Sequence, residues 1–117
     1  MIVVADASPL RYLVWIEEVQ LIPTVYGTAW IPPAVFRELS QPQTPSKVQR
    51  WIANTPSWLQ IRAPSNAPRE FVRTLGPGEC EAIALAEEMR ADFLLIDDRA
   101  GRKEAERRHL SIQGTLQ

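Results

Sequence analysis

The residues around position 95 constrain the fold of this chain most, because a continuous apolar run there ends in two adjacent aspartates. Phe93 to Ile96 shows no polar alternation, which is typical of a strand covered on both faces in a parallel sheet. Asp97 and Asp98 follow at its carboxyl end, where open α/β sheets bind ligands. Neighbouring carboxylates resist ionising together unless a cation or solvent intervenes. The pair therefore predicts either a cation site or a helix start with Asp98 as N-cap.

Charged residues flank this strand on both sides. Residues 79–89 have apolar side chains at helical spacing, and Glu79 and Glu81 fall in the first turn, where the helix dipole favours carboxylates. Residues 99–109 predict a basic helix after the aspartates, which begins with three cations: Arg99, Arg102 and Lys103. These cations either form a solvated helix face or contact phosphates.

A second short strand, near the N-terminus, also ends in a carboxylate. Residues 2–5 read Ile-Val-Val-Ala, and the run stops at Asp6. Ser8 is a good helix N-cap and Pro9 suits the first helical position. We therefore assign the capping role to Ser8, which leaves Asp6 free for chemistry.

The rest of the chain alternates short strands with helices. This alternation favours a single domain of residues 1–117 with an α/β/α sandwich around a mainly parallel sheet. The remaining strands are predicted at residues 29–31, 58–61 (an edge strand) and 110–113, and the remaining helices at residues 21–26, 34–39, 46–52 and 68–75.

Right-handed crossovers would bring the carboxyl ends of the strands at residues 2–5 and 92–96 to one edge of the sheet. Asp6 would then meet the two aspartates, and helix starts carrying Glu79 and Glu38 would lean into the same cleft. Glu38 lies beside the apolar stripe of its helix, so a solvated surface position is the alternative for it.

The composition limits the class of protein. A chain of 117 residues with 45% apolar content predicts one domain with a modest core. The net charge of −1 gives no overall attraction to nucleic acid, so such binding needs a local patch. A single cysteine, Cys80, suits a reducing cytoplasm. No apolar run approaches the roughly 20 residues of a membrane span, and the first residues lack the basic region of a signal peptide, so we expect a cytoplasmic protein.

The predicted cleft holds several carboxylates and neither histidine nor cysteine. Such a donor set matches a hard divalent cation, Mg²⁺ or Mn²⁺. A cation of this kind suits phosphoryl chemistry, because it activates water and shields a phosphodiester from the surrounding carboxylates.

Five short motifs, in order along nearly the whole chain, resemble those of PIN domains, and more narrowly the PIN-like toxins of VapC-type toxin–antitoxin systems. The motifs are Asp6-Ala7-Ser8-Pro9-Leu10; Ile31-Pro32-Pro33-Ala34-Val35 with Glu38; Glu79 with residues 81–86; Asp97-Asp98-Arg99; and Ile112-Gln113-Gly114-Thr115-Leu116. Relatives commonly continue into further helices after the last motif, so the resemblance is to a short or C-terminally truncated member.

The resemblance implies a metal-dependent ribonuclease site with four acidic positions. Asp6, Glu38 and Glu79 match the first three, and Glu81 is the alternative to Glu79. The fourth is Asp98 when the strand is aligned through its end, or Asp97 when it is aligned by spacing from Glu79. Ser8 matches a hydroxyl that supports the metal ligands.

The resemblance further implies an RNA substrate, cleaved by water activated by Mg²⁺ or Mn²⁺, together with a small antitoxin partner and a homodimer. Arg99, Arg102 and Lys103 would contact the RNA phosphates. The alternative is a catalytically silent PIN fold that binds protein or RNA. A receiver-like phosphoacceptor ranks last, because the first strand ends in a single aspartate and no lysine follows Lys103.

Overall fold

A computed structural model describes residues 1–65 and 75–114 of the chain. The strands are β1 (Val3–Ala5), β2 (Ala29–Ile31), β3 (Leu59–Ile61), β4 (Phe93–Leu95) and β5 (Ile112–Gln113). The helices are α1 (Ala7–Trp15), α2 (Leu21–Tyr26), α3 (Pro33–Leu39), α4 (Ser46–Ala53), α5 (Pro77–Met89) and α6 (Arg99–Arg107).

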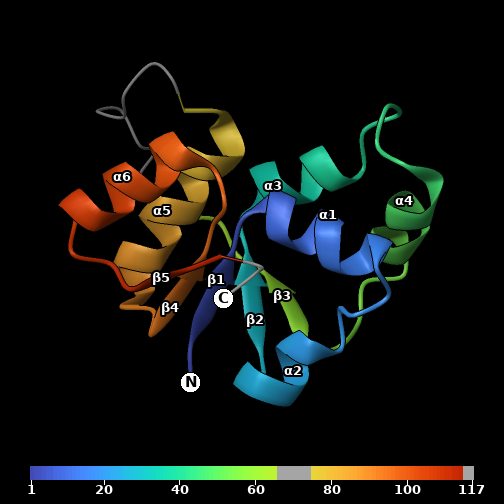
Figure 1. The fold of residues 1–117 in the computed structure, drawn as a ribbon, viewed down its shortest axis with the longest axis horizontal. Helices are drawn as coiled ribbons and strands as arrows, with labels where there is room; N and C mark the ends of the chain where they lie inside the picture. The colour runs from blue at the N-terminus through green and yellow to red at the C-terminus, as the bar shows by residue number, and fades with distance from the viewer. Residues whose placement is uncertain (66–74, 115–117) are drawn as a thin grey trace.

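The strands form one parallel sheet in the order β3-β2-β1-β4-β5 (Figure 1). In its centre, Val3, Val4 and Ala5 of β1 pair with residues 93–95 of β4. The chain leaves β1 toward β2 and leaves β4 toward β5, in opposite directions. The carboxyl ends of β1 and β4 therefore form the switch point at which open α/β sheets bind ligands.

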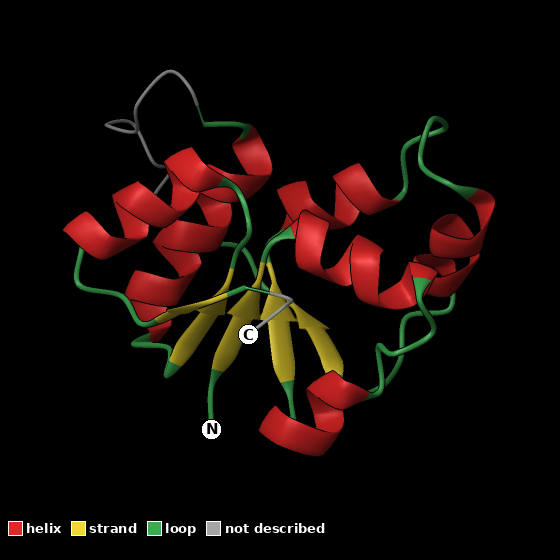
Figure 2. Cartoon of the chain, in the orientation of Figure 1, coloured by secondary structure: helices red, strands yellow, loops and turns green. Residues whose placement is uncertain are grey.

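The helices flank the sheet in two groups (Figure 2). The chain reverses its direction across the sheet between β3 and β4, so right-handed connections place α5 and α6 on the opposite face from α1 to α4. Helices α3 and α5 nevertheless meet, because both reach the edge of the sheet where the strands end. The switch point lies next to this meeting of helices.

The core explains why the central strands read as continuous apolar runs. Every residue of β1 is buried, as are Leu94, Leu95 and Ile96 of β4 and the turn after it. Ile83 and Leu85 of α5 are completely buried as well. Because both faces of β1 and β4 are covered, neither strand has a polar face, as predicted.

The predicted mainly parallel α/β sandwich is confirmed, and the strand and helix bounds agree within a few residues. The helix predicted at residues 68–75 falls largely outside the described residues. The assignment of Ser8 as N-cap is wrong. Helix α1 begins at Ala7, Asp6 holds the N-cap position without a side-chain capping bond, and Ser8 is an exposed residue of the first turn.

Candidate functional site

Asp6 follows β1 directly and is fixed by the sheet. Its backbone N–H donates to the Leu95 carbonyl at 2.9 Å, which continues the pairing of β1 with β4. Its side chain is 3% exposed, and its Oδ1 atom has no hydrogen-bond partner. Burial raises the pKa of Asp6 to about 6, and the negative charges of Glu38 and Asp98 add to this rise. The Ala7 backbone N–H and the Arg11 charge offset only part of this rise, so the charge of the buried Asp6 carboxyl is incompletely compensated inside the protein.

Glu79 is a half-buried residue in the first turn of α5 with one fully buried carboxyl oxygen. Its Oε1 atom accepts the backbone N–H of Gly76 at 3.1 Å, which caps the helix, while Oε2 is buried without a partner. Burial, followed by the neighbouring Asp98 carboxyl, raises the pKa of Glu79 to about 7. A Cβ atom on Gly101 would lie 2.6 Å from Ile96 Cδ1 and 3.0 Å from Glu79 Oε2, so the glycine in α6 leaves room for both side chains.

Asp98 begins α6 and also faces Glu79. Its Oδ2 atom accepts the N–H of Gly101 at 3.0 Å, so the predicted N-cap is present. The neighbouring Glu79 carboxyl and the hydrogen bond from Gly101 lower the pKa of Asp98. In the pair, Asp98 is therefore the charged partner and Glu79 the protonated one. Asp98 is an N-cap and a member of the acidic site at the same time.

Asp97 lies apart from this pair. A Cβ atom built on Gly114, just after β5, would lie 3.0 Å from Asp97 Oδ1 and 2.8 Å from Arg102 Nη1. Asp97 thus points toward the β5 side of the sheet and its neighbour Arg102. The geometry favours Asp98 over Asp97 as the strand-end member of the acidic site.

Glu38 reaches the site from the last turn of α3. The structure corrects our expectation that a helix start carries it, since α3 ends at Leu39. Glu38 Oε1 accepts the backbone N–H of Gly78 at 3.1 Å, and a Cβ atom on Gly78 would lie 2.3 Å from that oxygen. Its charge also raises the pKa of Asp6. The four carboxyl groups of Asp6, Glu38, Glu79 and Asp98, which we call the acid cluster, therefore occupy one site.

Glu81 points away from the acid cluster. Its Oε1 atom accepts the backbone N–H of Ala34 at 3.1 Å, and its Oε2 atom lies 3.9 Å from Arg37. Both contacts are made to α3. Glu81 is therefore committed to joining α5 to α3, and between Glu79 and Glu81 the geometry favours Glu79 for the cluster.

The predicted phosphate contacts divide into two kinds. Arg99 and Lys103 are exposed on α6, whereas Arg102 is half-buried and its guanidinium lies 3.4 Å from the Ile96 carbonyl. Arg102 therefore braces the end of β4. Arg11 of α1 is a cation that we did not single out from the sequence, and its charge lowers the pKa of Asp6.

The acid cluster fits a hard divalent cation in its donor chemistry. Asp6 Oδ1 and Glu79 Oε2 are the buried side-chain oxygens without a partner in the described part of the chain. Within residues 1–65 and 75–114, no three His, Cys, Asp or Glu side chains are grouped closely enough to hold a metal ion as they stand. Mg²⁺ does not need such a cage, because it usually binds one or two carboxylates and keeps several waters. Asp6 and Glu79 supply that number.

The family follows from the whole chain. Residues 2–117 match a family model described as a PIN domain (DUF3368). This chain belongs to the PIN domain family. PIN domains are commonly nucleases and generally use divalent metals. The family expected from the five motifs is thus confirmed.

Solved structures show the same PIN fold. A PilT N-terminus domain protein from the hyperthermophilic archaeon Sulfolobus solfataricus is similar with a TM-score of 0.68 and 17% sequence identity. The similarity covers 99% of this chain and 88% of that chain. At this identity the likeness shows the fold alone. No curated protein sequence matches the chain.

Three features of this PIN domain escaped the sequence analysis. They are the close approaches of Glu38 to Gly78 and of Glu79 to Gly101, and the bond from Glu81 to α3. The close approach at Gly101 could have been suspected from the sequence. A glycine inside a helix costs about 1 kcal/mol of stability relative to alanine, so its presence there indicates a close contact. The contacts between α3 and α5 leave no local pattern in the sequence, since they join residues 40 or more positions apart.

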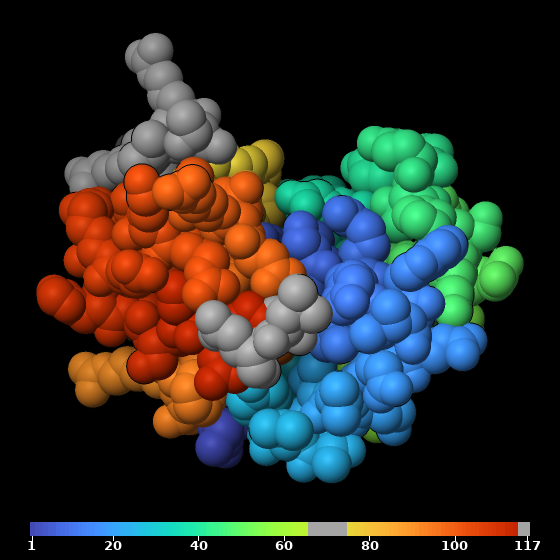
Figure 3. Space-filling model, viewed as in Figure 1, coloured from blue at the N-terminus to red at the C-terminus, as the bar shows by residue number. Residues whose placement is uncertain are grey.

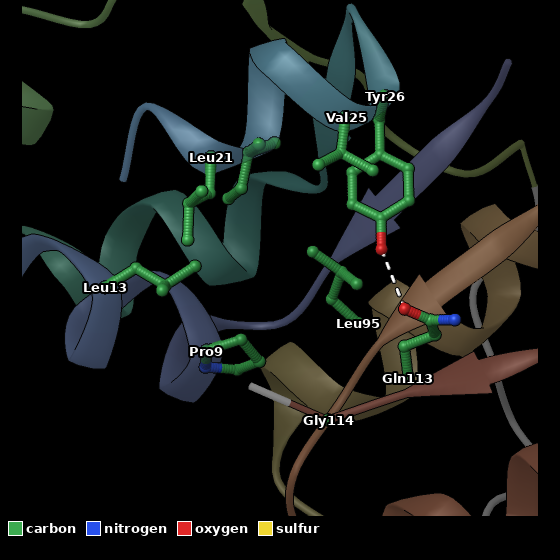
Figure 4. Close-up of a pocket in the computed structure, with 9 residues that line it drawn as sticks. Pro9, Leu13, Leu21, Val25, Tyr26, Leu95, Gln113 and Gly114 are labelled. Atoms are coloured by element: carbon green, nitrogen blue, oxygen red, sulfur yellow. Dashed lines mark hydrogen bonds between the residues drawn. The ribbon is translucent and has the colours of Figure 1, made fainter. Parts of the chain in front are cut away.

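A separate apolar cavity of about 220 Å³ lies between α1, α2 and the strands β4 and β5 (Figure 4). Its walls include Leu13, Leu21, Val25 and Leu95, and the Tyr26 hydroxyl donates to Gln113 Oε1 at 2.8 Å. None of the acid-cluster residues lines it.

No helix within the described residues is long and apolar enough to cross a membrane.

Proposed function

We propose that this PIN domain is a Mg²⁺- or Mn²⁺-dependent endoribonuclease whose active site is the acid cluster. The observation that carries the proposal is the pair of buried, unpartnered oxygens, Asp6 Oδ1 and Glu79 Oε2, at the switch point of the sheet. Buried carboxyl groups with raised pKa values and no cationic partner destabilise a fold. Their concentration at one site points to a ligand that carries positive charge.

Each residue of the cluster has a distinct task in this proposal. Asp6 and Glu79 hold the cation, and Asp98 adds negative charge from the start of α6. Glu38 keeps one oxygen on the Gly78 N–H, so its other oxygen can accept a proton from the attacking water. The bound cation supplies Lewis acidity toward the phosphodiester and lowers the pKa of water. Arg99 and Lys103 are the exposed cations of α6 that contact neighbouring phosphates.

The biological setting that we propose is a toxin–antitoxin pair in the cytoplasm. The motifs that resemble VapC-type toxins support it, as does the membership in the PIN domain family. A small antitoxin would then bind this chain, and a homodimer is the expected assembly. Co-expression with the protein encoded by the neighbouring reading frame tests the pairing, because a toxin should arrest growth unless that protein is present.

The experiment for the activity is RNA cleavage with Mn²⁺ in three variants. Asp6→Asn and Asp98→Asn should each abolish metal-dependent cleavage, because each removes a negative charge from the cluster. Asparagine is also a good N-cap, so Asp98→Asn keeps the start of α6. Asp97→Asn is the matched control and should leave cleavage near the wild-type rate. An equal loss of cleavage in Asp97→Asn and Asp98→Asn would contradict the assignment of Asp98, rather than Asp97, to the acid cluster.

A second candidate function is a catalytically silent binding module. The lack of a preassembled group of three metal-binding side chains in the described residues favours this alternative. A silent module should bind RNA or protein equally well with and without Mn²⁺, and should cleave no RNA at any Mn²⁺ concentration.

A further inference from the structure

The solvent-facing side of α1 presents an unusual set of side chains. Helical spacing places Ser8, Arg11, Tyr12 and Trp15 within about 100° of one another, opposite the buried residues Leu10, Leu13 and Val14. Tyr12 is 41% and Trp15 is 57% exposed, whereas the other three tryptophans of the chain are half-buried. Two large aromatic rings on a solvated helix face call for a partner.

This face starts at the acid cluster. Helix α1 begins at the residue after Asp6, and its nine residues span about 13 Å at 1.5 Å per residue. Arg11 lies near enough to Asp6 to influence its ionisation, and it forms no ion pair within the described residues. Figure 3 shows a hollow in the surface between α5 and α6 on one side and α1 and α3 on the other. The face of α1 continues outward from this hollow.

Trp15 is held in place by a neighbouring helix. The Lys47 ammonium of α4 donates to the Trp15 carbonyl at 3.1 Å and lies 6.0 Å from the centre of the indole ring. Lys47 also pairs with Glu17 at 3.1 Å. These contacts fix the end of α1 and leave the indole more than half exposed. The backbone that carries the ring is thus held in place, which leaves less freedom to be lost when a base stacks on the indole.

We propose that this face of α1 is the binding track for a single-stranded RNA segment leading into the acid cluster. One base stacks on Tyr12, another stacks on Trp15, and the Arg11 guanidinium contacts the phosphate nearest the cluster. Aromatic platforms beside a cation are the features that bind single strands without sequence preference. The track rests on the proposed function only in naming RNA cleavage as the reaction that it serves.

Charge favours a nucleic acid over a protein on this face. Arg11 lies on the same face as the two rings and forms no ion pair within the described residues, whereas the charge of Lys47 is shared with Glu17. The acid cluster, which we propose binds a cation, lies at one end of the face. The chain also exposes aliphatic side chains on α2, where Leu21 and Val25 are 50% and 59% exposed and line the separate cavity. A protein partner that needs apolar contact would use that cavity, so the α1 face is left for RNA.

The test is the affinity of the full chain for a fluorescein-labelled ten-nucleotide oligo(U), measured by anisotropy in Ca²⁺. Tyr12→Ala and Trp15→Ala should each weaken binding about tenfold, which is the size expected for one lost stacking platform. Tyr12→Phe and Trp15→Phe keep a ring and should bind within about threefold of wild type. Val25→Ala, equally exposed but on α2, should change nothing. An abasic oligonucleotide should not distinguish Tyr12→Ala or Trp15→Ala from wild type.

Several outcomes would overturn the track. They are a wild type that does not bind oligo(U), alanine variants that bind it as the wild type does, and phenylalanine variants as weak as the alanine ones. Alanine variants that lose only self-association in sedimentation would assign the face to a protein partner. The proposed function fails separately: a chain that binds oligo(U) through its rings but cuts no RNA in Mn²⁺ keeps the track and loses the nuclease.

Discussion

The pair formed by Glu79 and Asp98 shows how two adjacent carboxyl groups are tolerated without a cation. Burial raises the pKa of Glu79 to about 7, whereas hydrogen bonds lower the pKa of Asp98. In the metal-free protein one proton therefore stays on Glu79 below about pH 7, and the pair carries a single negative charge there. A divalent cation replaces that proton, so metal affinity should rise as the pH rises through 7.

Glu79→Gln tests this arrangement through stability. Glutamine can accept from the Gly76 N–H as Glu79 does, and its amide group stays uncharged beside Asp98 at every pH. Glu79 keeps its proton to about pH 7 in the folded state but loses it near 4.5 when unfolded. The metal-free wild type should thus lose stability between about pH 4.5 and 7. Allowing for solvent screening, Glu79→Gln should be more stable at pH 8 by about 1 kcal/mol, and equal to wild type near pH 4. Thermal unfolding in EDTA at pH 8 and at pH 4 measures the two stability differences.

Gly78→Ala separates stability from activity. A Cβ atom added at residue 78 would lie 2.3 Å from Glu38 Oε1 and would therefore displace the Glu38 carboxylate. Alanine favours a helix by about 1 kcal/mol over glycine, which offsets the lost hydrogen bond from Gly78 to Glu38. Cleavage should therefore fall by about tenfold or more while the melting temperature stays within a few degrees. Pro77→Ala, one residue earlier and exposed, is the control; cleavage by Gly78→Ala at the rate of Pro77→Ala would contradict the role of Glu38.

At the scale of elements, α3 and α5 hold each other at both ends of their contact. Glu81 of α5 accepts from Ala34 at the start of α3, and Glu38 at the end of α3 accepts from Gly78 at the start of α5. Each carboxylate binds a free N–H in the first turn of the opposite helix, where the helix dipole favours it. This exchange sets the position of Glu38 relative to Asp6.

Glu81→Ala should loosen this contact. The loss of a carboxylate that caps α3 should destabilise the protein by about 1 kcal/mol and slow cleavage, because Glu38 is no longer held in place. Glu81→Gln keeps an acceptor for the Ala34 N–H and should restore most of both quantities. If Glu81 were a metal ligand, Glu81→Gln would instead cleave as poorly as Glu81→Ala. Melting curves and initial cleavage rates distinguish the two.

The sequence specified the strands better than the helix ends. Strands β1 and β4 could be predicted because strands covered on both faces must be apolar throughout. That their carboxyl ends lie close together could be predicted from right-handed crossovers. The cap of α1 could not, since Asp6 and Ser8 are both good N-cap residues and only burial distinguishes them. The task of Glu81 depends on a contact 47 positions away, which no local pattern contains.

At the scale of the whole molecule, the proposed activity depends on one site at the carboxyl ends of the two central strands of the sheet. The topology brings β1 and β4 together and directs their connections apart, so the chain must deliver Asp6 and Asp98 to the same place. Helix α5 adds Glu79, and α3 adds Glu38. The fold thus concentrates negative charge at its switch point and leaves two buried oxygens without donors. A cation that binds only the folded state should stabilise the protein as well as serve catalysis.

The most direct test is calorimetric titration of the purified chain with Mn²⁺ at pH 8. The wild type and Asp97→Asn should bind Mn²⁺ alike, because Asp97 points away from the acid cluster. Asp6→Asn should weaken binding by more than about tenfold, since it removes a charged ligand. A wild type that takes up no Mn²⁺, or an Asp97→Asn variant that loses as much affinity as Asp6→Asn, would contradict a divalent-metal site formed by the acid cluster.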